Sequence, residues 1–343
     1  MNEPSTAAND PTGSAAQKRP RLLQNGPLLP SLEAALDAAY DVHRLRTPAE
    51  RAAFLAAPRA HGAFDGIVTS AAVGADAALI DAVPDARVIG SFGVGFDQID
   101  QGAAVRRGLQ VSYTPDVLND CVADTAFLLL MDVARGASAA DRFVRRGDWL
   151  KNRFPLTVKV SGKRLGIFGM GRIGRTIARR ASGFDMEVHY HNRSPQPDSP
   201  YGYERSLTDL ARWADFLVIA AAGGTGTRGL VSAEVLDALG PEGYLINISR
   251  GTVVDEPALV DALVNRRIAG AGLDVFEDEP NVPEALFALD NVVLLPHVAS
   301  ATHETRKAMG DLVAENLRSY FADGRLVTPV PWSAQADGRA AAA

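Results

Sequence analysis

The stretch KRLGIFGMGRIGRTIARRAS, residues 163–182, decides the fold of this chain. Its first part is a short apolar run that predicts a strand, and its last part has the spacing of an amphipathic helix, so a G-x-G-x-x-G turn joins the two. In such a turn Gly169 makes the bend, Gly171 can admit a pyrophosphate, and Gly174 lets the helix meet the strand. A turn that needs glycine only for packing is the competing interpretation. The position between strand and helix favours a dinucleotide site, because the helix start offers free N–H groups to phosphate.

The segment after Pro155 alternates strands and helices in the manner of a doubly wound α/β domain. Its six predicted strands are KRLGIFG (163–169), EVHYH (187–191), DFLVIA (215–220), GYLIN (243–247), GAGLDV (270–275) and NVVLLP (291–296). Helical patterns separate the first five, so these strands should be parallel and joined by crossover helices. We therefore predict a Rossmann-type dinucleotide-binding domain.

Another α/β unit precedes this one in the chain, and we call it the first unit. From residue 21 to 111 short apolar runs alternate with helical patterns, which again predicts parallel strands with crossover helices. A long buried helix is expected from about Leu118 to Arg146, joining the two units. The last helical segment, HETRKAMGDLVAENLRSYF (303–321), has no strand after it, so we expect it to cross back and pack on the first unit.

The expected fold is therefore α/β, with the Rossmann-type domain inserted in a discontinuous, flavodoxin-like α/β substrate domain. The expected parts are a disordered tail (1–19), the first part of the substrate domain (20–112), the NAD(P)-binding domain (113–296), the return to the substrate domain (297–331) and a second tail (332–343). Hinges are expected near 113–115 and 296–297, where the chain changes domain.

The composition argues against several classes of function. The chain has 343 residues, of which 47% are hydrophobic, so two domains with full cores are possible. Its net charge of -6 and the lack of a long basic run argue against nucleic acid as a partner. Cys121 is the only cysteine, and we expect neither a disulfide nor a metal. No apolar run approaches the roughly 20 residues that span a bilayer, and no signal-peptide pattern occurs, so we expect a cytoplasmic protein without a membrane partner.

The residues after the strand at 187–191 bear on the choice of cofactor. An acidic residue about 20 positions after the glycine turn would bind the 2′-hydroxyl of NAD. Here the strand ends in HNRS (191–194), and the nearest acidic residues precede or start the strand. Arg193 can pair with a 2′-phosphate, and Asn192 and Ser194 can hydrogen-bond it. We therefore expect NADPH/NADP in preference to NADH/NAD, against the alternative of an ordinary polar loop with a solvated Arg193.

Polar residues also follow strands of the predicted Rossmann-type domain, at the sheet edge where open α/β sheets bind ligands. His297 directly follows NVVLLP, and an imidazole exchanges protons readily near neutral pH, which favours acid–base chemistry over a structural role. Arg250 follows the strand at 243–247 and could grip a carboxylate and a carbonyl, or only form a surface ion pair. A carboxylate bonded to His297 would orient the ring and favour its protonated form. The spacing leaves four acidic candidates for this role: Asp274, Glu277, Asp278 and Glu279.

Several blocks of this sequence resemble the signatures of D-isomer-specific 2-hydroxyacid dehydrogenases. They are GKRLGIFGMGRIGRTIA (162–178), INISRGTVVDEPALVDAL (246–263), GAGLDVFEDEP (270–280) and NVVLLPHVAS (291–300). The resemblance covers nearly everything from Pro20 to Val330. Within that family, SFGVGFDQID (91–100), TPDVLNDCVADTAFLLL (114–130) and GDWLKNRFPLTVKVSGKR (147–164) are most similar to the NADPH-dependent glyoxylate/hydroxypyruvate and hydroxyphenylpyruvate reductases.

The resemblance implies a catalytic trio of Arg250, Glu279 and His297, with Glu279 chosen because a proline follows it as in the family. It also implies that the backbone N–H groups of Val94 and Gly95 bind the substrate carboxylate together with Arg250, and that His297 contacts the substrate as its proton donor. The residues expected to contact the cofactor are Gly169, Gly171, Arg172, Ile173, Gly174, Asn192, Arg193, Ser194, Ala221, Ile248 and Asp274, the last on the nicotinamide side. A homodimer is implied as well.

The resulting hypothesis is NADPH-dependent reduction of a small 2-oxoacid to the D-2-hydroxy acid, with the proton coming from His297. Glyoxylate, hydroxypyruvate and hydroxyphenylpyruvate remain open as substrates. The alternative is a nucleotide-sensing binding protein of the corepressor type on the same fold, which predicts NADH preference.

Two features bear on the pocket itself. Pocket walls could come from Trp149, Arg153, Phe154 and Trp332, although Trp149 and Phe154 could instead pack a dimer arm. The loop AAGGTGT (221–227) departs from the family, whose members usually carry a Pro and a Thr-Pro pair there, so we expect a more mobile cofactor cleft.

Overall fold

Five parallel strands form the first sheet, in the order β2-β1-β3-β4-β5. They are β1 (Arg21–Asn25), β2 (Asp41–Leu45), β3 (Gly66–Ser70), β4 (Val88–Phe92) and β5 (Gln110–Ser112). Their helices are α1 (Pro30–Ala39), α2 (Pro48–Ala56), α3 (Ala77–Ala82) and α4 (Gln101–Arg106), with the short helix η1 (Pro58–His61). A 2-1-3-4-5 order is that of flavodoxin-like sheets, which confirms the predicted fold of this unit. The computed structural model describes residues 19–334, so most of the tails expected at 1–19 and 332–343 lies outside the described residues.

Seven parallel strands form the second sheet, in the order β12-β11-β10-β9-β6-β7-β8. They are β6 (Arg164–Phe168), β7 (Glu187–His191), β8 (Gly202–Tyr203), β9 (Phe216–Ile219), β10 (Tyr244–Asn247), β11 (Gly270–Leu273) and β12 (Val292–Leu294). The helices between them are α7 (Arg172–Ala181), α8 (Leu207–Trp213), α9 (Ala233–Leu239) and α10 (Glu256–Val264), with the short helices η3 (Ser182–Phe184), η4 (Gly251–Val253) and η5 (Glu284–Leu286). Counted from β6, this is the 3-2-1-4-5-6 order of a Rossmann sheet with a seventh strand added. The predicted Rossmann-type domain is confirmed.

Strand β8 is the element of this sheet that the sequence pattern does not predict. It consists of two residues, which pair with His189 and Tyr190 of β7. Two residues are too few to show an alternation of apolar and polar side chains. The six-strand prediction is therefore one edge strand short.

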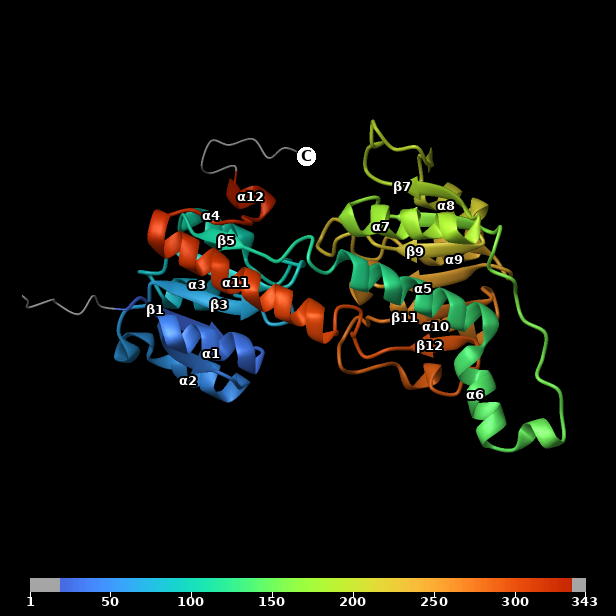
Figure 1. The fold of residues 1–343 in the computed structure, drawn as a ribbon, viewed down its shortest axis with the longest axis horizontal. Helices are drawn as coiled ribbons and strands as arrows, with labels where there is room; N and C mark the ends of the chain where they lie inside the picture. The colour runs from blue at the N-terminus through green and yellow to red at the C-terminus, as the bar shows by residue number, and fades with distance from the viewer. Residues whose placement is uncertain (1–18, 335–343) are drawn as a thin grey trace, which may run out of the picture.

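The segment that joins the two units is not a single helix. Helix α5 (Asn119–Arg135) ends at Gly136, which has a φ of 59° in the left-handed region, and α6 (Ala137–Arg145) begins after it. Glycine takes this conformation without a steric penalty and commonly ends helices. The prediction of one helix from Leu118 to Arg146 is wrong for this reason. Helix α5 packs against α7, β10 and β11, whereas α6 extends away from the sheets (Figure 1).

The C-terminal segment packs on the first sheet. Helix α11 (His303–Asp323) contacts α1 and β4, where Gly90 leaves room for the buried side chain of Leu317. Helix α12 (Pro331–Ala334) follows, and the Ser333 hydroxyl accepts the N–H of Val111 at 3.1 Å. Trp332 packs against the core of the same unit. The tail expected from residue 332 therefore begins too early, since residues 332 and 333 are packed.

The two sheets form two separate lobes, and α5 and α11 lie where the chain passes between them (Figure 1). Every residue of β9, β10 and β11 is buried, because helices cover both faces of the second sheet. The loops at the carboxyl ends of these strands are therefore the parts left to form a site. None of the helices from residue 19 to 334 combines the length and apolar character needed to cross a membrane.

Candidate active site

The three glycines of the turn between β6 and α7 have different surroundings. Gly169 has a φ of 105°, and a Cβ there would lie 2.4 Å from the backbone nitrogen of Ala221. A Cβ on Gly174 would lie 2.2 Å from the carbonyl oxygen of Gly169, so only glycine lets the helix meet the strand here. A Cβ on Gly171 would meet no atom within 4 Å, and no side chain caps α7. Gly169 and Gly174 are thus in tight contact with the backbone, whereas the space beside Gly171 is open. Since this space lies at the N-terminus of a helix, it suits a pyrophosphate.

The other expected cofactor contacts lie around this turn. The side-chain oxygen of Asn192 accepts the N–H of Met170 at 2.7 Å, so Asn192 holds the turn in place. Arg193 and Ser194 are exposed at the end of β7. Ala221 and Ile248 are buried directly after β9 and β10. The described residues place no acidic side chain at 192–194, in the position that would oppose a 2′-phosphate.

Arg172, the first residue of α7, reaches the linker between the two units. Its Nε lies 3.1 Å from a carboxylate oxygen of Asp116, and its Nη1 donates to the hydroxyl of Tyr113 at 3.2 Å. The start of the cofactor helix is therefore tied to the segment 113–116, where one of the two hinges is expected.

A strained turn presents His297 at the end of β12. His297 has a φ of 53°, in the left-handed region that non-glycine residues seldom adopt. Its N–H donates to the carbonyl of Asp274 at 2.9 Å, and the Asp274 carboxylate accepts the N–H groups of Val298 at 2.7 Å and Ala299 at 2.9 Å. Burial raises the pKa of Asp274, and those two N–H groups lower it only in part. The fully buried Asp274 therefore holds the backbone from 297 to 299 in place.

Glu279 is the acidic residue that bonds His297. Its Oε2 lies 2.7 Å from Nδ1 of the ring, and its Oε1 accepts the N–H of Phe276 at 3.1 Å. The side chains of His297 and Glu279 are 41% and 36% exposed, so the pair faces solvent on one side. Burial raises the pKa of Glu279, but the hydrogen bond and charge of His297 and the charge of Arg250 outweigh it and leave that pKa below its ordinary value. The Glu279 carboxylate is therefore ionised at neutral pH and accepts a hydrogen bond from the ring.

The remaining acidic candidates have other partners. Glu277 pairs with Arg228, and its N–H donates to Glu256 at 3.0 Å. Asp278 accepts the side-chain amide of Asn281 at 3.0 Å. With the Asp274 carboxylate bonded to backbone N–H groups, Glu279 is the one of the four whose carboxylate bonds the ring of His297.

Arg250 lies after β10 and reaches across to the loop that follows β4. Its Nε and Nη2 donate to the two carboxylate oxygens of Asp97 at 3.3 and 3.2 Å, and its Nη1 donates to the carbonyl of Ser249 at 2.8 Å. A Cβ on Gly95 would lie 1.6 Å from Nη2, so the guanidinium lies directly against Gly95. Arg250 and Gly95, which the sequence predicts in one substrate site, are thus brought together.

The loop after β4 is held in place by the linker. Gly93 has a φ of 143°, its N–H donates to the Thr114 hydroxyl at 3.1 Å, and its carbonyl accepts the N–H of Thr114 at 2.9 Å. Within residues 19–334, no acceptor is bonded to the N–H of Val94 or Gly95. These two N–H groups are therefore available to an anion, as an oxyanion or carboxylate site requires.

Some expected pocket residues lie elsewhere, and one residue was missed. Trp149 is exposed on the short helix η2 (Asp148–Leu150), Phe154 packs on Phe143, and Trp332 packs in the core of the first unit. Asp97 was not predicted, although it stands two residues after Gly95 in the quoted block SFGVGFDQID. Only its contact with Arg250, 153 positions away, reveals it. Within residues 19–334 there is no group of three or more side chains able to hold a metal ion.

Comparison with known proteins agrees with this geometry. The family model described as D-isomer specific 2-hydroxyacid dehydrogenase, NAD binding domain, matches residues 127–299. A hydroxyphenylpyruvate reductase of Plectranthus scutellarioides is 48% identical over 304 residues, which cover 89% of this chain and 96% of the relative. A 2-ketogluconate reductase of Gluconobacter oxydans is 43% identical over 312 residues, covering 91% and 99%.

A solved structure is similar over the same length. The NADPH-dependent glyoxylate/hydroxypyruvate reductase from Sinorhizobium meliloti, in complex with NADP and malonate, superposes with a TM-score of 0.87 at 43% identity, covering 92% of this chain and 98% of the other. One assignment accounts for these matches together with the strand orders, the glycine turn and the Glu279–His297 pair. This chain belongs to the D-isomer specific 2-hydroxyacid dehydrogenase family and is an NAD(P)-dependent oxidoreductase.

Proposed function

We propose that this enzyme reduces a small 2-oxoacid, glyoxylate or hydroxypyruvate first among the candidates, to the D-2-hydroxy acid with NADPH. The observation that carries the proposal is the Glu279–His297 pair, bonded at 2.7 Å and close enough to Arg250 for the guanidinium to lower the pKa of Glu279. An acid and a carbonyl-polarising cation at the end of a dinucleotide-binding sheet suit reduction of a ketone next to a carboxylate.

Each residue has a role that its contacts support. Glu279 occupies Nδ1 of His297, which leaves Nε2 to carry the proton toward the substrate. Arg250 polarises the ketone, and the N–H groups of Val94 and Gly95 receive the carboxylate. When bound, the reduced nicotinamide supplies the hydride. The residues that would hold this cofactor are the open glycine turn at Gly171, the N-terminus of α7 and the loop at 192–194.

The preference for NADPH is proposed from Arg193. Its side chain is exposed where a 2′-phosphate would approach, and the neighbouring positions are not acidic. Arg193→Ala should raise the KM for NADPH about tenfold, the effect of one lost charge-assisted hydrogen bond, and leave the KM for NADH nearly unchanged. Arg205→Ala, which removes an exposed arginine beyond β8, is the matched control. Equal losses with the two cofactors would contradict the assignment.

One assay tests the function as a whole. Initial rates with NADPH and NADH across glyoxylate, hydroxypyruvate and hydroxyphenylpyruvate should show turnover, fastest with NADPH. Relatives that bear the names of reductases of these acids motivate the panel. Binding of NADH without turnover of any of the three would contradict the proposal and favour a nucleotide-sensing protein.

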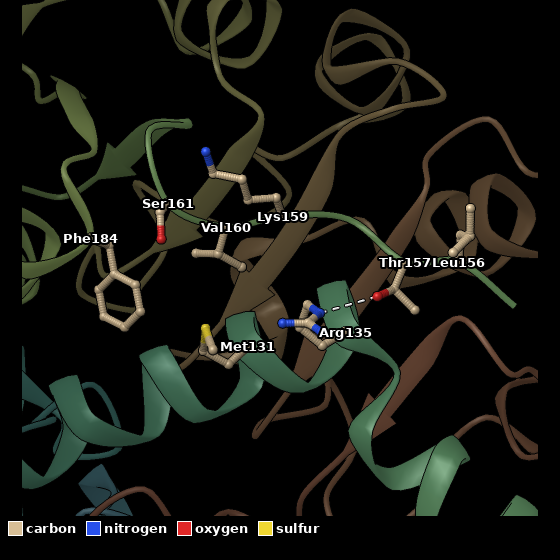
Figure 2. Close-up of a pocket in the computed structure, with 8 residues that line it drawn as sticks. All are labelled: Met131, Arg135, Leu156, Thr157, Lys159, Val160, Ser161 and Phe184. Atoms are coloured by element: carbon tan, nitrogen blue, oxygen red, sulfur yellow. Dashed lines mark hydrogen bonds between the residues drawn. The ribbon is translucent and has the colours of Figure 1, made fainter. Parts of the chain in front are cut away.

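We also propose that the enzyme is a homodimer joined through residues 137–160, which we call the arm. Helix α6 in the arm has no buried residue, and Leu150 and Leu156 are 91% and 102% exposed. A hollow of about 410 Å³ lies between α5 and the end of the arm (Figure 2), and none of Arg250, Glu279 and His297 lines it. There Arg135 donates to the Thr157 hydroxyl at 3.1 Å and Met131 lies beside Val160. A second copy of the arm region is the partner we assign, because pairing of two arms would cover these exposed leucines.

A further inference from the structure

An ion pair joins the two lobes at the catalytic centre. Asp97 comes from the loop after β4 in the first lobe, and Arg250 follows β10 in the second. Their side chains are 16% and 25% exposed, so the pair is partly shielded from water. The inference drawn from this pair rests on the proposed function, because it concerns how Arg250 meets a 2-oxoacid.

Some N–H donors of the Arg250 guanidinium are bonded within the protein, and the others remain available to a substrate. The group has five N–H donors in a fixed plane. Its Nε–H and one Nη2–H go to Asp97, and one Nη1–H goes to the carbonyl of Ser249. One N–H on each terminal nitrogen is left, and these two donors can bind a carbonyl and a carboxylate oxygen. Asp97 thus takes one edge of the group and leaves donors at its end for a substrate.

Two glycines leave the pair little room to move. A Cβ on Gly95 would lie 1.6 Å from Nη2 of Arg250 and 2.8 Å from Oδ1 of Asp97. On the other side, a Cβ on Gly223 would lie 2.5 Å from Cγ of Arg250 and 3.4 Å from Oδ2 of Asp97. Gly223 belongs to the loop that departs from the family pattern. The pair is therefore enclosed by backbone on two sides, and any added side chain there would displace the guanidinium.

Stability does not account for this arrangement. Partly exposed ion pairs contribute only about 0–1 kcal/mol to folding. The two bonds, at 3.2 and 3.3 Å, are also longer than the typical 2.9 Å of an N–H···O bond. Two parallel bonds nevertheless fix the direction of a planar group. The pair formed by Asp97 and Arg250 therefore serves to orient the guanidinium rather than to stabilise the fold.

We propose that Asp97 is a positioning residue for the reduction. From the first lobe it fixes the Nε–Nη2 edge of Arg250, so that the two remaining donors can bind the ketone and the carboxylate of the 2-oxoacid. The bonds to Asp97 set the orientation of the guanidinium before the substrate binds. This matters for the rate, since a misplacement of about 1 Å can cost a hundredfold.

Two variants of Asp97 separate orientation from charge. Asp97→Asn keeps the size but accepts only one of the two bonds, and its amide opposes the second. Asp97→Glu keeps the charge but moves the carboxylate by one methylene. For both variants we expect kcat for glyoxylate to fall about tenfold or more at saturating NADPH. The Kd for NADPH, measured by its fluorescence, should stay unchanged, and oxamate, an unreactive analogue of a 2-oxoacid, should bind the NADPH complex more weakly.

Asp41→Asn removes another Arg–Asp ion pair of the first lobe, between Arg21 and Asp41 at 3.0 Å, and should leave every constant unchanged. Unchanged kcat in Asp97→Asn, with or without a lower Tm, would overturn the proposal. A second pattern would also overturn the proposal: Asp97→Asn binds oxamate more tightly and turns over normally, while Asp97→Glu behaves like the wild type. That pattern would indicate an effect of the Asp97 charge alone. If the unchanged enzyme reduces no 2-oxoacid, the proposed function fails, while oxamate binding still tests Asp97.

Discussion

The turn at His297 places backbone strain beside the side chain that carries the proton. A non-glycine residue in the left-handed region costs about 1–2 kcal/mol, and His297 is held there with a φ of 53°. The three bonds to Asp274 offset that cost, because they fix the backbone from 297 to 299. Strain of this kind persists where the surrounding structure determines it, and here it accompanies the bond between the ring and Glu279.

This geometry predicts the behaviour of a conservative variant. Asparagine adopts the left-handed region more easily than most residues, so His297→Asn should keep the turn and the Tm while it removes the acid. We expect kcat to fall about 10²–10⁴-fold, the usual contribution of a general acid. In the unchanged enzyme, kcat/KM for reduction should fall as pH rises, because the reduction takes up a proton. Glu279 does not contribute to that fall, because its lowered pKa keeps it ionised at neutral and higher pH. A variant with wild-type turnover would contradict the role of His297.

At the level of single residues, the sequence predicts which side chains lie at the carboxyl ends of strands but not which of them touch. His297 and Arg250 could be found because each directly follows an apolar run. The choice of Glu279 among four acids came from family resemblance, and its bond to His297 depends on how the backbone from 274 to 279 turns. Asp97 gave no local signal, because its partner lies 153 positions away.

At the level of elements, the strand–turn–helix unit was predictable because local spacing determines it. An apolar run, three glycines and an amphipathic helix are all read within 20 residues. Strand β8 was not predictable, since two residues form a strand only when the neighbouring strand offers a partner. The break at Gly136 depends on a positive φ, whereas an isolated glycine is often tolerated inside a helix.

The three glycines of the turn permit a matched test. Gly171→Ala places a methyl group where no protein atom lies within 4 Å, in an extended backbone that alanine adopts readily. We expect an unchanged Tm and a KM for NADPH raised about tenfold or more, because the methyl would hinder a pyrophosphate. Gly174→Ala should instead cost about 3 kcal/mol of unfolding free energy in urea, because its Cβ would lie 2.2 Å from the carbonyl oxygen of Gly169. Equal effects of the two changes on stability and on cofactor binding would contradict this division.

At the scale of the whole molecule, the site forms because two lobes face one another. The first lobe supplies Asp97 and the free N–H groups of Val94 and Gly95, and the second supplies Arg250 and the Glu279–His297 pair. The linker bonds between Gly93 and Thr114 connect the substrate loop to the passage between the lobes. Sequence patterns predict each lobe and the return of the last helix to the first lobe, but not which side chains of the two lobes meet.

The arm presents apolar surface that neither lobe covers, which leads to a prediction about assembly. Leu150 and Leu156 are its most exposed apolar side chains, and the hollow beside α5 lies next to Leu156 (Figure 2). Burying one leucine fully contributes about 1.5–3 kcal/mol, so placing charges at both positions should separate a dimer. We expect the unchanged protein to have twice the 36.3 kDa chain mass in light scattering, and Leu150→Glu/Leu156→Glu to have a single chain mass. Phe287→Glu, at an exposed aromatic outside the arm, should remain dimeric. An unchanged protein that is monomeric at micromolar concentration would contradict the proposed interface.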